Sequence, residues 1–596
     1  MWRLEGVEIP NPNHFGSEGR TGGPINAVNS NLLNTSDFFT GAFAPEYGNA
    51  TSGVFDMKLR NGNNRRHERS IGIGALGVDA TFEGPFSKNS QASYLANYRY
   101  STLALLDLVS AADFNGIPKY QDATFKVNLP TKKAGTFSLF GLGGISSIQQ
   151  QMRDSSDVLF VDAKYKANVG VVGLKHLYQL SSKSYLISSL SANTNGNAGE
   201  FWFDAGEGLA LTNIERMQRS EYRLASTYHH KIDHRNSLKA GAIYTINQYD
   251  FDVKYTDPAR GELTEALKAR GTADLAQAFV SWKHRFTADL SFTGGMHYMH
   301  FMLNNAVSAE PRLGMNWQRN AKQSFSIAYG LHSKLEPITL YFADVYQEDG
   351  SLTKPNRELR LGKAHHLVLG FNQSLSPLLH FKTELYYQYL HGVPVVNDPN
   401  SAFSMINSVG PFANREMINA GLGRNYGAEF TLERFFSRGF FFMNTLSVYQ
   451  SEYQAMDQLW RNTAFNGNYI TNVLAGKEFV RGKNDKKRTY GISGKLLYGG
   501  GSRYTPVDLA ASIEKGAEVR DVNRIYGAQS DDLFMANMVF YTRKDRKRSS
   551  HEFRLDFQNI SNHQSRLSDY YNPRTKSIEY ARQLPIMPAF MYKIDF

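Results

Sequence analysis

The sequence has no cysteine in its 596 residues. This absence excludes a disulfide scaffold, a zinc domain with Cys ligands and a Cys nucleophile. The chain also lacks the run of about 20 apolar residues that a transmembrane helix requires. Its longest apolar run with helical character, 103–109, is interrupted by Asp107. Charged residues make up only 20% of the chain and apolar residues 41%, which is unlike the composition of a disordered protein.

Aromatic residues, in contrast, are plentiful at 13%, although the mean hydropathy is −0.42. A soluble all-β protein fits this combination. So does a membrane-spanning β-barrel, because only alternate residues of its strands face lipid. The net charge of +11 is mild for this length and is compatible with a basic lumen, basic turns or contact with an anionic surface. It does not by itself indicate a nucleic-acid partner.

The hydrophobic pattern repeats every two residues. In the last segment, 589–596, Phe590, Tyr592, Ile594 and Phe596 alternate with Ala589, Met591, Lys593 and Asp595. Segments 381–389, 426–433 and 551–557 alternate in the same way. Such a pattern predicts strands with one apolar and one polar face. Charges in the middle of the polar face and aromatics at the ends of the apolar face favour a barrel over a soluble sandwich.

The predicted connections alternate in length. Short polar turns such as 129–135, 181–184 and 231–236 are separated by long segments, among them 197–218, 253–272, 334–362 and 393–420. This alternation predicts an outer-membrane barrel of about 22 antiparallel strands over residues 66–596, with long extracellular loops. A barrel this wide needs something to fill it. Residues 1–65, which are rich in Gly, Asn and Pro, are predicted to be that filling.

Several segments resemble one known family. Residues 46–60, with Tyr47-Gly48 followed by Gly53-Val54, resemble the end of the plug domain of TonB-dependent receptors. Residues 5–15 are similar to the plug segment of the branch found in Bacteroidetes-type bacteria. Barrel segments 329–333, 425–429, 461–467, 501–506 and 556–562 match signatures of that branch, and the terminal Phe596 is similar to the C-terminal signal of outer-membrane barrels.

The resemblance implies an all-β fold, a transmembrane barrel of about 22 strands occluded by a partial plug domain, with residues 1–65 as the C-terminal part of the plug. It implies active uptake of a scarce nutrient (a siderophore, cofactor, peptide or glycan) across the outer membrane of a Gram-negative bacterium. The implied partners are TonB with its inner-membrane energising complex, outer-membrane lipid or lipopolysaccharide, and a candidate surface lipoprotein. The family also has an upstream plug half and a TonB-pairing segment, so we expect the sequence to be part of a longer protein.

Two sets of residues are candidates for function. Asn13, His14 and Phe15 lie in the plug segment where a ligand could reach them, and the loop aromatics Trp202, Tyr249 and Trp460 could stack on a ligand, form loop cores or line the membrane interface. Plug residues Glu46, Asp56, Lys58 and Arg60, facing barrel residues such as Glu429 and Arg554, are candidates for a polar and movable plug–barrel interface. Static ion pairs are the alternative.

Other motifs predict no catalysis, cofactor or metal. Residues 72–77 spell G-x-G-x-x-G, but strand-like sequence follows, so a tight turn between the first two strands is predicted in place of a nucleotide site. His229 and His230 are strand neighbours that face opposite ways, which is unsuited to a shared metal. The basic run 543–548 has no interleaved aromatics to stack on bases, so it is predicted to be a periplasmic turn.

Three functional hypotheses therefore remain. The first is energised uptake of a nutrient. The second is a barrel that does not pump and acts as a structural or secretion-associated partner of other surface proteins. The third is a soluble all-β binding protein. An enzyme is not favoured, because no nucleophile–base arrangement is recognisable.

Overall fold

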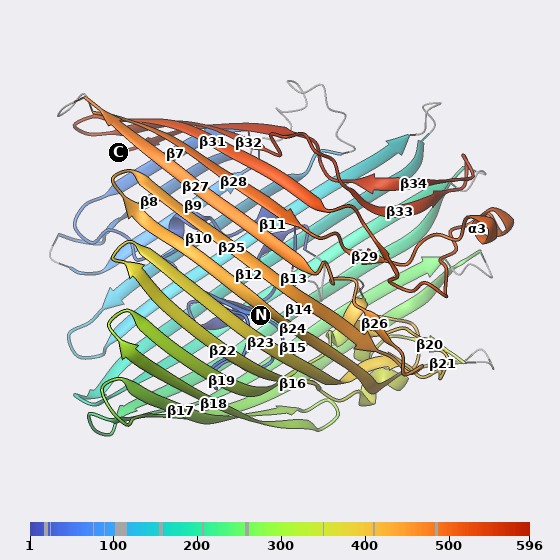
Figure 1. The fold of residues 1–596 in the computed structure, drawn as a ribbon, viewed down its shortest axis with the longest axis horizontal. Coiled ribbons are helices and arrows are strands. Elements are labelled where there is room, and N and C mark those ends of the chain that lie inside the picture. The colour runs from blue at the N-terminus through green and yellow to red at the C-terminus, as the bar shows by residue number, and fades with distance from the viewer. Residues whose placement is uncertain are drawn as a thin grey trace.

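The computed structural model describes the chain except for residues 17–21, 24, 76, 89, 102–115, 154–158, 205–207, 257–260, 348, 350, 409, 411 and 483–486. The apolar run 103–109 lies outside the described residues. The rest forms one large closed barrel with a smaller sheet inside it (Figure 1).

The barrel is a closed sheet of 22 antiparallel strands, which confirms the predicted fold class. A short extra strand, β26 (Trp460–Asn462), pairs with β25 beyond the point where β25 pairs with β27. The 22 strands are β7 (Glu68–Gly74), β8 (Gly77–Pro85), β9 (Ser93–Tyr100), β10 (Lys119–Pro130), β11 (Thr136–Arg153), β12 (Leu159–Ser181), β13 (Ser184–Asp204), β14 (Leu209–Lys231), β15 (Asn236–Thr256), β16 (Leu263–Arg285), β17 (Leu290–Phe301), β18 (Ala306–Asn320), β19 (Gln323–Lys334), β22 (Gly362–Ser376), β23 (Leu379–Val396), β24 (Met417–Ser437), β25 (Phe440–Gln454), β27 (Tyr469–Arg481), β28 (Arg488–Gly499), β31 (Leu533–Asp545), β32 (Ser550–Gln558) and β35 (Met587–Asp595).

Alternating side chains divide the wall into two faces. On β13, Asn193 and Asn195 are buried toward the lumen, whereas Leu190 on the other face is 59% exposed. Leu224 on the neighbouring strand β14 is likewise 59% exposed on the outside. An apolar exterior around a polar interior is the pattern of a barrel whose outer surface contacts lipid.

Two of the predicted long loops are wrong. Residues 197–218 and 253–272 are mostly strand: β13 and β14 remain paired out to Asp204 and Leu209, and β15 and β16 out to Thr256 and Leu263. Strands of up to 23 residues exceed the 9–11 that crossing a bilayer takes. The ladder therefore continues beyond the apolar band, because the backbone groups of the two strands stay hydrogen-bonded to each other in water as well.

The G-x-G-x-x-G segment forms the predicted tight turn. Strand β7 ends at Gly74 and β8 begins at Gly77, and these two residues face each other in an antiparallel pair. A side chain at Gly74 would meet the carbonyl oxygen of Phe590 at 2.4 Å, so the close approach of β35 accounts for a glycine there.

Residues 1–65, called the plug below, carry the inner sheet. Its four strands are ordered β2 (Val7–Ile9), β1 (Trp2–Leu4), β6 (Val54–Met57) and β5 (Asp37–Phe39), and β1 runs parallel to β6. The plug also holds a two-stranded ribbon, β3 (Asn13–His14) with β4 (Ile25–Asn26), and a 3-10 turn, η1 (Ser30–Leu32).

The long loops carry small elements of their own. These are α2 (Ile338–Tyr341), α3 (Leu509–Lys515), η2 (Pro355–Glu358), η3 (Met405–Asn407) and the paired strands β20 (Val345–Tyr346) with β21 (Leu352–Thr353), β29 (Arg503–Tyr504) with β30 (Ala528–Gln529), and β33 (Arg566–Asn572) with β34 (Ser577–Arg582). In the described part of the chain, no helix is both long and apolar enough to cross a membrane.

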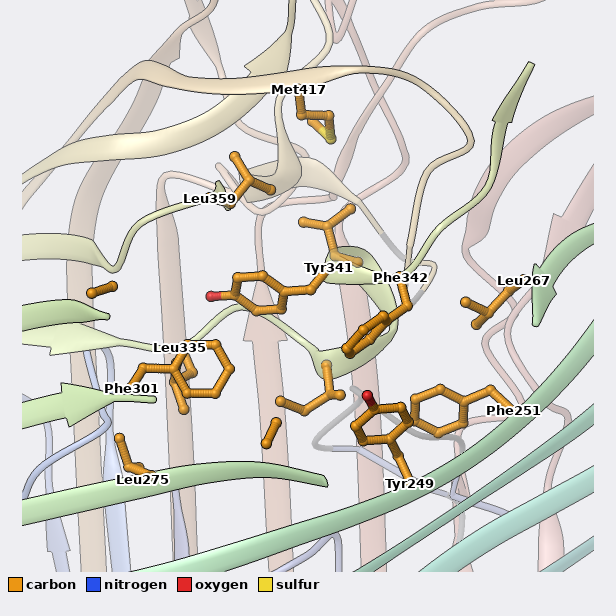
Figure 2. Packing of buried hydrophobic residues seen from close by; sticks show 14 of the residues in the cluster. Tyr249, Phe251, Leu267, Leu275, Phe301, Leu335, Tyr341, Phe342, Leu359 and Met417 are labelled. Atoms are coloured by element: carbon orange, nitrogen blue, oxygen red, sulfur yellow. The ribbon is translucent and has the colours of Figure 1, made fainter. Parts of the chain in front are cut away.

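The loop between β19 and β22 folds over the lumen. Tyr341 and Leu340, both with 0% exposure, pack with Phe251, Phe301 and other inward side chains of β15–β17 (Figure 2). At its base, the backbone N–H of Leu335 donates to Asn49 Oδ1 of the plug at 2.9 Å. The loop is therefore a hydrophobic cover on one side of the barrel mouth that carries the long loops, and it is in contact with the plug.

Candidate functional site at the interface of plug and wall

The plug is joined to the barrel by ion pairs on several strands. Glu5 pairs with Lys126 of β10, Glu8 with Arg223 of β14 and Glu46 with Lys239 of β15, each at 2.7 Å. In a fourth pair the cation is on the plug and the carboxylate on the wall: Arg60 donates two hydrogen bonds of 2.7 Å to Glu83 of β8. Because an unpaired charge in such a site is costly, each partner holds the other in position.

One side of the plug is held by apolar packing. Leu4, Val7, Leu32 and other buried plug residues form one cluster with inward side chains of β9–β12, among them Phe140 and Leu142. At about 25 cal/mol per Å² of buried apolar surface, such a cluster is a firm attachment. The plug is therefore anchored against β9–β12 by apolar packing as well as by the Glu5–Lys126 pair, whereas its contacts named above with β14 and β15 are ion pairs.

Wall side chains hold plug residues 41–48, called the plug loop below, in a cradle of hydrogen bonds. Arg312 of β18 donates to the carbonyl oxygens of Ala44 at 2.7 Å and Tyr47 at 2.5 Å, and it pairs with Glu310 at 2.5 Å. His297 Nδ1–H donates to the carbonyl of Pro45 at 2.7 Å. His366 Nδ1 accepts the N–H of Ala42 at 3.2 Å. Backbone groups of the loop are thus bound by side chains of three wall strands.

Two neighbouring cavities that share lining residues lie beside this loop. The inner one, of about 300 Å³, separates plug residues such as Glu8 and Tyr47 from the wall of β12–β16. The outer one, of about 370 Å³, opens between the turns of the same strands at the rim with short turns. Glu46, His229 and Lys239 line both, so the Glu46–Lys239 pair stands at the junction.

The predicted ligand residues of the plug face the wall. His14 is 2% exposed, and its Nε2 lies 3.0 Å from Asp122 of β10, which also accepts from Arg99 at 2.6 Å. The N–H of Phe15 donates to Ser146 of β11 at 3.0 Å, and Asn13 contacts Asn11 within the plug. Contact of Asn13, His14 and Phe15 with a ligand stays a prediction.

The predicted aromatic ligand contacts lie in three separate environments. Trp202 is on the outward face of β13, beneath the Lys164 ammonium at 4.8 Å. Tyr249 is only 5% exposed and packs against Phe342 of the covering loop. Trp460 stacks with the Arg424 guanidinium at 4.2 Å. The structure therefore does not gather them into one site, and a ligand role for each stays a prediction.

The six residues predicted at the plug–barrel interface divide into two groups. Glu46 and Arg60 contact the wall as described above, and Glu429 lines a cavity of about 270 Å³ beside Thr40 and Ser52 of the plug. Asp56 instead accepts a hydrogen bond from Tyr47 within the plug, and Lys58 pairs with Asp37 there. Arg554 is exposed on β32, and the ion pairs that the described residues form with the plug do not include it.

Glu5 and Glu8 and their wall partners Lys126 and Arg223 were not among the predicted interface residues. The alternation in β10 and β14 places both cations on the polar face, so their inward direction was predictable. Which plug residue each would meet depends on how the plug sits in the lumen, and no local pattern encodes that. Among the described residues, no group of three or more His, Asp or Glu side chains is placed to hold a metal ion.

The plug carboxylates should make plug seating depend on pH. Burial is the largest single effect on the pKa of Glu8 and acts to raise it, but Arg223 and Arg219 together with smaller effects hold the pKa below its ordinary value of 4.5. Burial likewise acts to raise the pKa of Glu46, and Lys239 together with Arg3 and a backbone hydrogen bond holds that pKa below its ordinary value. A lowered folded-state pKa contributes stability above pH 4.5 that is lost as the pH falls through the folded-state value.

We therefore expect the plug to loosen below about pH 4.5. Protection of the plug from hydrogen–deuterium exchange, corrected for the intrinsic pH dependence of exchange and measured on purified protein between pH 7 and pH 3, should fall over that window. In a Glu8→Gln/Glu46→Gln variant protection should be weaker at pH 7 and should change less with pH. If protection of the plug changes with pH as steeply in that variant as in the unmodified protein, other groups control plug seating.

The comparisons with known proteins give the fold. No family model matches the chain, and no curated protein sequence does. Solved structures do match: FpvA of P. aeruginosa bound to a heterologous pyoverdine has a TM-score of 0.71 at 11% identity, with 100% of this chain and 79% of that chain covered. The siderophore receptor PiuA of Acinetobacter baumannii has a TM-score of 0.68 at 9% identity, covering 100% and 89%. The FrpB iron transporter of Neisseria meningitidis has a TM-score of 0.66 at 12% identity, covering 100% and 91%. The chain thus shares the fold of these three proteins over its whole length.

Proposed function

We propose that the protein is a TonB-dependent outer-membrane receptor that takes up a scarce nutrient, and that it is not an enzyme. The observation that carries the proposal is a wide barrel closed by its own N-terminal segment through buried ion pairs, such as Glu8–Arg223 and Glu46–Lys239. A plug that served only to fill the lumen would gain as much from apolar packing, whereas charged groups can exchange their partners for water or solute when the plug shifts.

The energy for this shift comes from outside the chain. The sequence has no G-x-x-x-x-G-K-[ST] motif, and its G-x-G-x-x-G at 72–77 joins two strands, so we propose that TonB and its inner-membrane complex act mechanically on the plug. Cargo bound outside changes the plug's equilibrium only by its differential affinity for the two plug states. The similar structures include a siderophore receptor and an iron transporter, which makes an iron-bearing solute the first cargo class to test.

Several finer points belong to the same proposal. Residues 1–65 are the C-terminal part of the plug domain, and residues 66–596 are the barrel. The sequence signatures at 425–429 and 461–467 favour the branch found in Bacteroidetes-type bacteria. A surface lipoprotein and outer-membrane lipopolysaccharide are the further partners. Contact of Asn13, His14 and Phe15 with cargo requires that the plug turn these residues away from β10 and β11.

Uptake of radiolabelled iron tests the proposal. A deletion strain, its complemented strain and a strain without TonB would be compared with ferric catecholate, ferric hydroxamate and haem as probes under iron limitation. We expect uptake of at least one probe to fall to background in both deficient strains and to return on complementation. Uptake that is unchanged without the protein for all three probes would leave the alternative function, a barrel that does not pump and partners other surface proteins.

A further inference from the structure

In the two cavities between the plug and β12–β16, the acidic side chains come from the plug and most of the basic side chains come from the wall. Among the described residues that line them, every acid belongs to the plug: Glu5, Glu8, Glu46 and Asp56. The wall contributes only bases, namely Lys175, Lys183, Arg223, Lys231, Lys239 and Lys283. Arg3 and Lys58 are the plug's own cations at the inner cavity. The wall by itself is therefore a cationic surface, which plug carboxylates neutralise at rest.

This surface runs from the lumen to the rim with short turns. Arg223 lies at the inner cavity, Lys239 at the junction, and Lys183, Lys231 and Lys283 around the outer opening. The Glu46–Lys239 pair crosses the junction, and its two side chains are 20% and 32% exposed. The pair is thus wetted by the cavities that it separates, unlike the apolar contacts on the β9–β12 side.

From this arrangement we propose that β12–β16 form the exit path for an anionic solute, with the Glu46–Lys239 pair as its gate. This proposal rests on the proposed function and deepens it in two respects: it assigns a negative charge to the cargo, and it says on which side of the plug the cargo passes. When Glu46 moves away, Lys239 loses its counter-charge, and when Glu8 moves away, Arg223 keeps only the more distant Glu221 of its own strand, at 4.0 Å. An anion replaces those carboxylates, whereas a cation meets only like charge.

The chain's lack of cysteine provides a direct test on the purified full-length protein. Ala225 lies on the lumen face of β14 beside the inner cavity, so an Ala225→Cys substitution introduces a small thiol there. Its rates of modification by an anionic sulfonatoethyl and a cationic trimethylammonioethyl methanethiosulfonate report access and local potential. The exposed Ala510→Cys on α3 corrects for the reagents' intrinsic reactivity.

Two variants break the same gate and leave opposite charges. Glu46→Gln leaves Lys239 unpaired, and Lys239→Gln leaves Glu46 unpaired. We expect both to speed modification of Ala225→Cys about tenfold over the intact gate, and we expect the anionic-to-cationic rate ratio to be about tenfold higher in Glu46→Gln than in Lys239→Gln. If the pair holds the plug without closing this path, neither variant speeds modification.

The proposal is overturned if neither variant speeds modification, because the pair would then not close the path. It is also overturned if the two ratios are equal or the order is reversed. The measurement needs neither cargo nor TonB, so its result is independent of the iron-uptake assay. If the modification rates show the expected charge preference but the cells take up no probe, the transport function alone is rejected. If the cells take up a probe but the rates show no charge preference, the anionic path alone is rejected.

Discussion

Replacing Gly48 by valine is expected to unseat the plug loop and make the barrel leak. A Cβ atom at Gly48 would lie 2.1 Å from His297 Nε2 and 2.3 Å from Gln277 Oε1. The His297 ring is 0% exposed and is tied to the carbonyl of Pro45, so it has no space into which to retreat. Overpacking of this kind costs about 1–3 kcal/mol, and here the cost falls on the loop that Arg312 and His297 hold.

Leakage is measured as sensitivity of cells to a glycopeptide antibiotic too large for porins, and as conductance of the purified protein in a planar bilayer. Gly22→Val is the matched control, because Gly22 is an exposed plug glycine whose added Cβ would meet no atom within 4 Å. Both readouts should rise several-fold for Gly48→Val and stay at the level of the unmodified protein for Gly22→Val. Equal behaviour of the two variants would show that seating of this loop does not seal the barrel.

The barrel was predictable from sequence because its signal is local. Alternation such as Phe590, Tyr592, Ile594 against Met591, Lys593, Asp595 fixes the two faces of a strand wherever the strand ends. Strand ends were less predictable. The long loops expected at 197–218 and 253–272 are continuations of β13–β16, since polar side chains allow a ladder to extend into water.

The interface between plug and wall was predictable only in part, because it is made by residues far apart in the chain. The Tyr47-Gly48 motif carried the resemblance to the end of a plug domain, and it lies in the loop that the wall side chains hold. Glu46 and Arg60 are in contact with the wall. Glu8 meets Arg223 across 215 positions, a pairing without a sequence signal. Tyr249 is covered by the loop that holds Phe342, and such a cover depends on tertiary packing alone.

Locking the plug loop to the wall is expected to abolish uptake. The Cβ built on Gly295 of β17 comes within 2.5 Å of Pro45 Cγ, which leaves the two β-carbons within about 4 Å of each other, the separation of a disulfide. The same Cβ lies 2.4 Å from the carbonyl oxygen of Val280, so β16 and β17 must shift locally to accept the cysteine. A Pro45→Cys/Gly295→Cys variant therefore ties the loop next to the Glu46–Lys239 gate. With no other cysteine in the chain, no competing disulfide forms within it.

A second lock on the anchored side is the matched control. An added Cβ at Gly144 of β11 would lie 3.4 Å from Ala27 Cβ, near the same range, with a few tenths of an ångström of movement required of His14. Because the plug packs against β9–β12 through apolar contacts, an Ala27→Cys/Gly144→Cys lock should leave uptake largely intact. The two locks thus distinguish movement beside β13–β17 from departure of the whole plug, which both locks would stop.

The most direct test of the claim that this barrel transports by shifting its own N-terminal plug is iron uptake by cells that carry the Pro45→Cys/Gly295→Cys lock, before and after reduction. Uptake should fall to the level of the deletion strain when the cross-link is complete by mass spectrometry, and return when a reductant opens it. Full uptake with the cross-link intact would contradict the claim.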